Sequence, residues 1–221
     1  ALQAAIMRQL HYYPSTASMA PHIVLHEIGA PFDLVLVDRT QDAHRAPDYL
    51  RLNPNGTIPV YTEDGLVLYE SAAICLHLAD THPQAALMPP LGSAQRAHAT
   101  KWLLWLTNTL QPALMIYFYP ERWSDAGDAR GAERLKWHAQ QRVGPLLDQL
   151  DQTLASHGGP WLLGTAYSVV DPFCLMLCRW TRGMARPART LPHLGPYLQR
   201  VLARPAVQRA YAQEGLGEPR V

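Results

Sequence analysis

The fold class is indicated by residues 53–60, which read Asn53-Pro54-Asn55-Gly56-Thr57-Ile58-Pro59-Val60. Asn, Pro and Gly in succession predict a turn, and the apolar residues that follow predict the start of a strand. A proline inside a predicted strand removes one donor of the hydrogen-bond ladder. Pro59 therefore indicates a strand edge or a cis turn that leaves the backbone of Ile58 unpaired. The alternative is a trans proline that ends an ordinary strand.

The residues on both sides of this stretch predict a regular order of strands and helices. Strands are predicted over residues 6–13, 31–37, 58–62 and 66–68, and helices from the hydroxyl-rich residues 15–18 to Gly29, over 47–52 and over 71–80. The resulting order is β-α-β-α-β-β-α. A parallel crossover followed by a hairpin and a covering helix is the order that a thioredoxin-like fold requires.

The character of the sequence changes at the proline-rich residues 82–90, which lack periodicity and predict a linker. Only helices are predicted beyond it, with long amphipathic runs over 95–118 and 129–156. The predicted fold class is therefore α/β plus all-α. We expect a thioredoxin-like domain over residues 1–83, a linker over 84–92 and an all-helical domain over 93–221.

The charge balance disfavours polyanionic partners. The chain has 19 Lys and Arg residues against 18 Asp and Glu residues, a formal net charge of +1, so no strong positive field draws it to nucleic acid or to an anionic membrane. Its three cysteines lie in apolar helical patterns, which indicates buried thiols in a reducing compartment. No targeting segment and no membrane-spanning run is evident, so we expect a soluble protein in the cytoplasm.

Three features of the sequence, spread over both predicted domains, together resemble the cytosolic glutathione S-transferase family, in particular its bacterial beta-like and theta-like members. They are residues 53–60 followed by Glu70-Ser71-Ala72-Ala73-Ile74, the stretch from Tyr13 to Ile23, and the sequence Gly164-Thr165-Ala166-Tyr167-Ser168-Val169-Val170-Asp171. In the order and spacing found here, the three features form a specific pattern, although each of them alone is a weak signal. The resemblance implies glutathione as the co-substrate, a homodimer and no metal.

Glu70 and Ser71 lie where a strand gives way to a helix, so they can hold the ammonium and the carboxylate of an amino acid. Alternatively, Ser71 caps the helix and Glu70 interacts with the helix dipole, and both interpretations can hold together. The resemblance implies that this pair binds the γ-glutamyl end of glutathione, and that Ile58, before a cis Pro59, binds its cysteinyl part.

The resemblance also places His44 at the glycyl carboxylate of glutathione, although an exposed loop histidine is the alternative. Many relatives carry a lysine where this chain has Thr57, so one ionic contact to glutathione is absent and the affinity is expected to be modest.

The residue that stabilises the glutathione thiolate is expected in the turn after the first strand. A hydroxyl at a helix N-terminus can stabilise a thiolate by a charge-assisted hydrogen bond and by the helix dipole. By resemblance to theta-like and zeta-like enzymes, Ser15 is the first candidate, Thr16 the second, and Tyr13 or Ser18 the third. Beta-class enzymes have a cysteine where this chain has Ala17, so thiol exchange through a protein cysteine is not expected. The alternative role of these hydroxyls is helix capping.

The resemblance implies a pocket for the electrophile lined by aromatic and apolar residues, whereas plain core packing is the alternative for such a cluster. The residues expected in the pocket are Tyr13, Met115, Phe118, Tyr119 and Trp123. His22 and His26 are four residues apart on one predicted helix, but the Glu of a zinc-protease motif is missing, so we expect surface or boundary histidines. The box Ser168-Val169-Val170-Asp171 is expected to fix a helix start.

The leading hypothesis is a transferase that conjugates the glutathione thiol to small hydrophobic electrophiles. A reductase or dehalogenase that uses glutathione at the same site is the second hypothesis. A non-catalytic binding module with the same fold is the third, and the retained Glu70-Ser71 pair argues against it.

Overall fold

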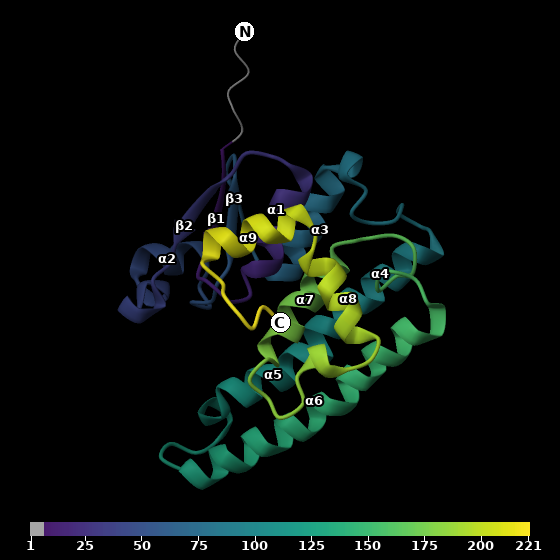
Figure 1. The fold of residues 1–221 in the computed structure, drawn as a ribbon. Coiled ribbons are helices and arrows are strands. Elements are labelled where there is room, and N and C mark those ends of the chain that lie inside the picture. The colour runs from purple at the N-terminus through teal and green to yellow at the C-terminus, as the bar shows by residue number, and fades with distance from the viewer. Residues whose placement is uncertain (1–6) are drawn as a thin grey trace. The chain divides into compact units, whose positions relative to one another are not determined.

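The computed structural model describes residues 7–221, which divide into two compact units (Figure 1). The first unit contains the residues up to Met88 together with Arg204–Gly217, and the second contains Pro89–Ala203 together with Glu218–Val221. Within residues 7–221, no helix is both long enough and apolar enough to cross a bilayer.

The first unit is built on a mixed four-stranded sheet with the strand order β2-β1-β3-β4. The strands are β1 (Arg8–Tyr12), β2 (Asp33–Leu36), β3 (Val60–Glu63) and β4 (Leu66–Tyr69). Strand β1 is parallel to β2 and antiparallel to β3, and β3 forms a hairpin with β4. At the centre of the register, Leu10 lies opposite both Leu34 and Tyr61. The thioredoxin-like order predicted from the sequence is confirmed, with Ile6 of the first predicted strand lying outside the described residues.

Helices α1 (Met19–Ile28), α2 (Pro47–Leu52) and α3 (Ser71–Thr81) complete this order. Helix α1 packs against α3 and against α9 (Pro205–Glu214), and all its residues from Met19 to Leu25 are buried. It ends at Gly29, whose φ of 70° is the left-handed conformation that commonly closes a helix. The buried side chains that join the sheet to the helices include Leu10, Met19, Ile23, Tyr61, Ile74 and Leu78.

Helix α9 gives a division of the chain that differs from the one expected. The boundary falls between Met88 and Pro89, inside the expected linker 84–92, but Arg204–Gly217 belongs to the first unit and not to the helical domain expected over 93–221. The physical reason is that α9 buries its apolar face in the first unit, where it packs on α1. A bidentate ion pair from Arg204 to Glu27, with N···O distances of 2.6 and 2.9 Å, holds its first turn.

The second unit is all-helical, as predicted. Its helices are α4 (Ala94–Trp105), α5 (Gln111–Phe118), α6 (Ala129–His157), α7 (Val170–Trp180) and α8 (Leu194–Leu202). A π-helical turn, Leu106–Leu110, separates α4 from α5 inside the run predicted over 95–118. Pro112 has no N–H to donate to the carbonyl four residues earlier, which favours this wider turn.

The start of α7 has the structural role that the sequence predicted for residues 168–171. Asp171 accepts hydrogen bonds from the backbone N–H groups of Ser168 (2.9 Å) and Leu162 (3.0 Å), and from the Tyr197 hydroxyl (2.7 Å). Every residue of α7 is buried, so this carboxylate anchors the central helix of the second unit.

Candidate functional site

The site begins at Ile58, whose side chain is anchored while its backbone is left unpaired. The side chain packs against a cluster formed by Val37, Tyr49 and Val60. The Ile58–Pro59 peptide is cis, as expected from the sequence, and the sheet ladder begins only at Val60. Neither the N–H nor the C=O of Ile58 makes a hydrogen bond to any of the residues described here. This backbone can therefore pair with an extended peptide, because both a donor and an acceptor are available.

The preceding turn is held rigidly by Asn53, which is fully buried. Its side-chain amide donates to the carbonyl and the hydroxyl of Thr57, at 2.9 and 3.0 Å, and its carbonyl oxygen accepts from the N–H of Asn55. Gly56 has a φ of 60°, and a Cβ there would lie 3.2 Å from the carbonyl oxygen of His44. Glycine thus lets this turn approach the short helix that carries His44 (Ala43–Arg45).

His44 is half-buried and Thr57 is exposed. The carbonyl of Thr57 accepts hydrogen bonds from Asn53 and from the Tyr49 hydroxyl. The structure therefore places the backbone of His44 close to the turn that carries Thr57 and Ile58.

Glu70 and Ser71 form the start of α3. Glu70 has a φ of 73°, and its exposed carboxylate has no partner among residues 7–221. The first N–H groups of α3 have no partner inside the helix, so they can donate to a carboxylate. The Ser71 hydroxyl donates to the carbonyl of Ala17 at 2.7 Å, which ties this helix start to the turn before α1. A ligand carboxylate would thus meet backbone N–H groups, and an ammonium would meet Glu70.

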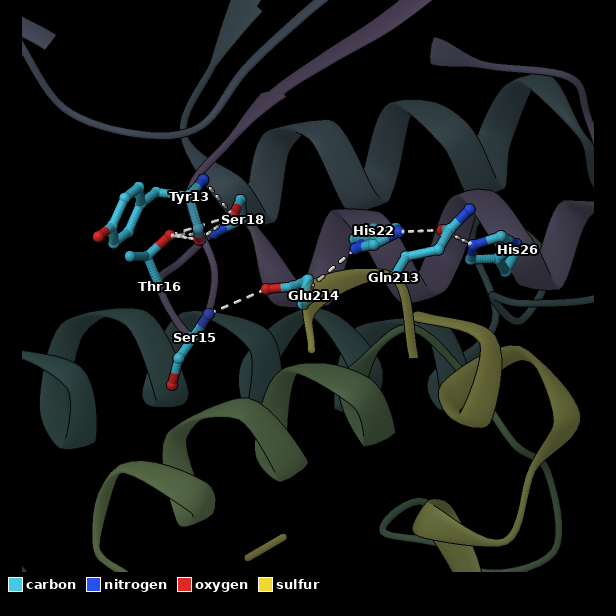
Figure 2. A network of polar contacts seen from close by, with 8 residues as sticks. All are labelled: Tyr13, Ser15, Thr16, Ser18, His22, His26, Gln213 and Glu214. Atoms are coloured by element: carbon cyan, nitrogen blue, oxygen red, sulfur yellow. Dashed lines mark hydrogen bonds and ion pairs between the residues drawn. The ribbon is translucent and has the colours of Figure 1, made fainter. Parts of the chain in front are cut away.

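The hydroxyls of the turn before α1 do not cap that helix, which corrects the capping interpretation (Figure 2). Thr16 donates to the carbonyl of Tyr13 at 2.7 Å, and the Ser18 hydroxyl lies 3.1 Å from the same carbonyl and 3.0 Å from Thr16 Oγ1. Ser18 occupies the N-cap position without a capping hydrogen bond from its side chain. The backbone of Ser18 is in the right-handed helical region (φ −74°, ψ −14°), whereas a capping residue is typically extended.

Ser15 differs from its neighbours because its hydroxyl is not engaged. Its backbone has a φ of 61°, and its N–H donates to Oε1 of Glu214 at 2.9 Å. The Ser15 hydroxyl makes no hydrogen bond within the described part of the chain, and Figure 2 shows it pointing away from the hydroxyls of Thr16 and Ser18. A hydroxyl carries one proton to donate. Ser15 can offer that proton to a ligand, whereas the proton of Thr16 is already donated to Tyr13.

The expected electrophile-pocket residues fall in both units. Met115 and Phe118 lie in the last turns of α5, Tyr119 follows, and Trp123 ends a short 3-10 helix (Pro120–Trp123). The ring edge of Phe118 meets the buried Trp180, and the guanidinium of Arg122 lies 4.0 Å from the centre of the Tyr119 ring. Tyr13, by contrast, belongs to the first unit and is half-buried.

The expectation that His22 lies at the surface or boundary is wrong. Its side chain is fully buried, its Nδ1 lies 2.9 Å from Glu214 and its Nε2 lies 2.7 Å from Gln213. Gln213 also contacts His26 at 2.7 Å. Sequence reasoning missed Gln213 and Glu214 because about 190 residues separate them from their partners, and no local pattern marks such a pair.

The cysteines do not take part in this site. All three are buried. Burial raises the pKa of the Cys75 thiol, and a hydrogen bond with Cys178, together with burial, raises the pKa of Cys174. Across residues 7–221, no group of three or more His, Cys, Asp or Glu side chains is arranged to hold a metal ion.

Comparison with known proteins identifies the family. Residues 14–81 match the model of the glutathione S-transferase N-terminal domain, and residues 109–214 match that of the C-terminal domain. The chain is 31% identical to glutathione S-transferase GST-4.5 of Xanthomonas campestris, over 94% of this chain and 99% of that protein. It is 28% identical to the disulfide-bond oxidoreductase YfcG of Escherichia coli, over 97% of this chain and 99% of that protein.

Solved structures agree with these matches. A glutathione transferase homologue from Sulfitobacter with bound glutathione superimposes with a TM-score of 0.87 at 26% identity, covering 95% of this chain and 99% of that one. A sphingomonad glutathione S-transferase complexed with glutathione gives a TM-score of 0.80 at 33% identity, covering 95% of this chain and 100% of the other. With both domain models matched and relatives aligned over nearly their whole length, this chain belongs to the glutathione S-transferase family.

Proposed function

We propose that this protein conjugates the thiol of glutathione to small hydrophobic electrophiles, with the Ser15 hydroxyl stabilising the thiolate. The observation that carries the proposal is that Ser15 alone of the three hydroxyl residues in its turn has an unengaged side chain. The link from Ser71 to Ala17 places this turn beside the start of α3.

The first step is the binding of glutathione along the first unit. Glu70 pairs with the ammonium of the γ-glutamyl group, and the first N–H groups of α3 bind its carboxylate. The N–H and C=O of Ile58 pair with the cysteinyl part of the tripeptide. His44 faces the glycyl carboxylate. Thr57 stands where many relatives carry a lysine, and it offers glutathione no positive charge. Two structures of relatives that hold bound glutathione support glutathione as the ligand.

The second step is activation of the thiol. A thiol has a reference pKa of about 8.5, so most of it is protonated at neutral pH, and each unit by which the pKa falls needs about 1.4 kcal/mol of thiolate stabilisation. The Ser15 hydroxyl donates a charge-assisted hydrogen bond to the sulfur, at the end of the turn that leads into α1. The positive end of the α1 dipole acts in the same direction.

The third step is transfer. The thiolate sulfur donates its electron pair to the electrophilic carbon and forms a carbon–sulfur bond. A leaving group departs with its bonding pair or, in an addition, the product takes a proton from water. We propose that the aromatic segment of the second unit, with Met115, Phe118, Tyr119 and Trp123, provides an apolar surface for the electrophile. Phe118 and Trp123 are both exposed, so they are accessible to an apolar substrate.

A glutathione-dependent reductase at the same site is the second candidate, favoured by the likeness to the oxidoreductase YfcG. The buried cysteines, two of them with raised thiol pKa values, mean that the thiol of glutathione would be the nucleophile in that reaction too. Assaying a chloronitrobenzene and a disulfide of glutathione with the same preparation distinguishes the two candidates.

The test of thiol activation is Ser15→Ala, with Thr16→Val as the matched control. The pKa of bound glutathione is titrated by its thiolate ultraviolet absorbance. We expect Ser15→Ala to raise this pKa by about one unit and to slow conjugation about tenfold at pH values below it. Thr16→Val should leave the pKa unchanged and lower stability by about 1 kcal/mol, because it removes one bond to Tyr13. An unshifted pKa in Ser15→Ala would contradict the proposed role of Ser15.

A further inference from the structure

We infer that Glu214, in the last turn of α9, is a positioning residue for Ser15, which it holds in the conformation that presents the hydroxyl to the glutathione thiolate. The inference rests on the proposed function of Ser15 and adds a residue that lies 199 positions away in the sequence. Glu214 acts through the backbone of Ser15 and needs no contact with glutathione.

The two carboxylate oxygens of Glu214 contact different partners (Figure 2). Oε1 accepts the N–H of Ser15 at 2.9 Å, and Oε2 lies 2.9 Å from Nδ1 of His22. Because an ionised carboxylate only accepts hydrogen bonds, His22 donates here. The side chains of Glu214 and His22 are both fully buried, so neither contact is exchanged for water.

The partner of Glu214 is itself fixed in place. Nε2 of His22 lies 2.7 Å from the side-chain oxygen of Gln213, which also contacts His26. The ring of Phe32 packs edge-on against both histidines. His22 and Gln213 therefore hold the end of α9 against α1. This contact keeps Oε1 of Glu214 facing the turn that contains Ser15.

The backbone of Ser15 needs a contact that holds it in place, because its φ of 61° lies in the left-handed region. A non-glycine residue there is less stable than in the right-handed conformations, and it remains only where the surroundings hold it. Without an acceptor for its N–H, Ser15 would relax toward negative φ. That change redirects the side chain, so the hydroxyl would lose its alignment with the thiolate.

A purely structural role is the competing explanation, since α9 must be anchored to α1 in any case. The chain offers a matched control at the other end of the same helix. The ion pair between Arg204 and Glu27 also joins α9 to α1, at the opposite end of α9 from Glu214. Arg204→Met should lower the melting temperature without changing the pKa of bound glutathione.

A purely electrostatic role predicts a change of the opposite sign. A carboxylate near the thiolate disfavours the second negative charge, so its removal would lower the thiol pKa. Loss of positioning raises the pKa, because the hydroxyl no longer stabilises the thiolate. Glu214→Ala removes both the charge and the acceptor, and Glu214→Gln removes only the charge. The amide oxygen of glutamine can still accept from Ser15, while its NH2 group donates to the other tautomer of His22.

The experiment titrates bound glutathione by thiolate absorbance in the full-length protein. We expect Glu214→Ala to raise the pKa by about half a unit to one unit, a three- to tenfold slower conjugation at lower pH. Glu214→Gln should give a pKa at or below that of the wild type. In a Ser15→Ala background, Glu214→Ala should raise the pKa no further, since the hydroxyl that it positions is gone.

Four results separate the possible failures. An unshifted pKa in Ser15→Ala removes the proposed function and this inference with it. A shift in Ser15→Ala with none in Glu214→Ala overturns the inference alone. The inference is also overturned if Glu214→Gln raises the pKa of bound glutathione as much as Glu214→Ala does. A raised pKa in Arg204→Met overturns it as well. If Glu214→Ala does not fold, Glu214→Asp is measured instead. It keeps the charge but shortens the reach to Ser15, so a raised pKa supports the inference and an unchanged one overturns it.

Discussion

Two residues of the site, Ser15 and Glu70, have positive φ values although neither is glycine. Backbone in this region is held by its surroundings, and such residues concentrate at functional sites. At Ser15 the N–H is bound by Glu214, and at Glu70 the carbonyl accepts the N–H of Ile74 at 3.0 Å, the first bond of α3. In both cases the backbone is engaged while the side chain has no partner among the described residues. Such a side chain is available to a ligand.

This availability leads to a prediction for Glu70. Glu70→Gln should raise the dissociation constant of glutathione about 3- to 30-fold, because the amide cannot neutralise the ammonium of the ligand. Since Glu70 is exposed to solvent, the loss of binding free energy is limited to about 0.5–2 kcal/mol. Stability should stay within about 0.5 kcal/mol, since Glu70 has no partner to lose. Isothermal titration calorimetry measures the affinity.

The control is Glu133→Gln, which removes an exposed carboxylate of the second unit that also has no partner among residues 7–221. We expect it to bind glutathione like the wild type. Equal affinities in Glu70→Gln and Glu133→Gln would remove Glu70 from the proposed site.

At the scale of elements, the sequence predicted best what depends on local geometry. The turn at Asn53–Gly56 and the strand break at Pro59 were readable, because Asn, Pro and Gly restrict the backbone wherever they stand. The lack of a side-chain cap at α1 was not, because it goes with the helical backbone of Ser18, which depends on how the turn closes. The π-helical turn Leu106–Leu110 was missed although Pro112 stands next to it, because the apolar periodicity continues across it.

The start of α7 allows a second prediction. Asp171→Ala should lower the free energy of unfolding by about 2–4 kcal/mol, because it leaves the N–H groups of Leu162 and Ser168 and the Tyr197 hydroxyl without their buried acceptor. Ser168→Ala should cost about 1 kcal/mol, since its hydroxyl accepts only the N–H of Val170. Urea unfolding of both variants checks this order. A larger loss in Ser168→Ala than in Asp171→Ala would contradict the assignment of Asp171 as the anchor.

A third prediction concerns His11 in β1, where burial lowers the histidine pKa below its ordinary value of 6.5. Below that value the unfolded chain binds a proton that the folded state resists, so stability falls as the pH falls. His11→Gln should therefore reduce the loss of unfolding free energy between about pH 7.5 and about pH 5.5. His26, whose pKa is lowered mainly by burial, contributes the same trend in both proteins. An unchanged pH dependence in His11→Gln would show that His11 does not contribute.

At the scale of the whole molecule, the sequence predicted two folded parts but not that α9 packs with the first compact unit. Its apolar periodicity indicates a helix with one buried face, and nothing in that pattern says which surface covers the face. The same limit applies to the site. Ser15, Ile58 and Glu70 were predicted from local signals and family resemblance, whereas Glu214 comes to Ser15 only through the return of the chain to the first unit.

The last prediction is the assembly of the molecule, for which we propose a homodimer that pairs α3 of one subunit with α4 of its partner. Leu104, in the last turn of α4, is a large apolar side chain that is 52% exposed. Ala72, Ala73 and Leu76 on α3 are only partly buried. Light scattering at micromolar concentration should give about twice the 24.7 kDa of one chain.

Leu104→Glu places a charge in this proposed interface, and burying an unpaired charge costs several kcal/mol, so the variant should shift toward the monomer mass. Leu91→Glu is the matched control, because Leu91 is 81% exposed and lies outside α3 and α4. It should keep the mass of the wild type. A wild-type mass near 24.7 kDa would contradict the dimer. A dimer that Leu104→Glu leaves intact would move the interface away from α4, because no stable interface tolerates an unpaired buried carboxylate at its centre.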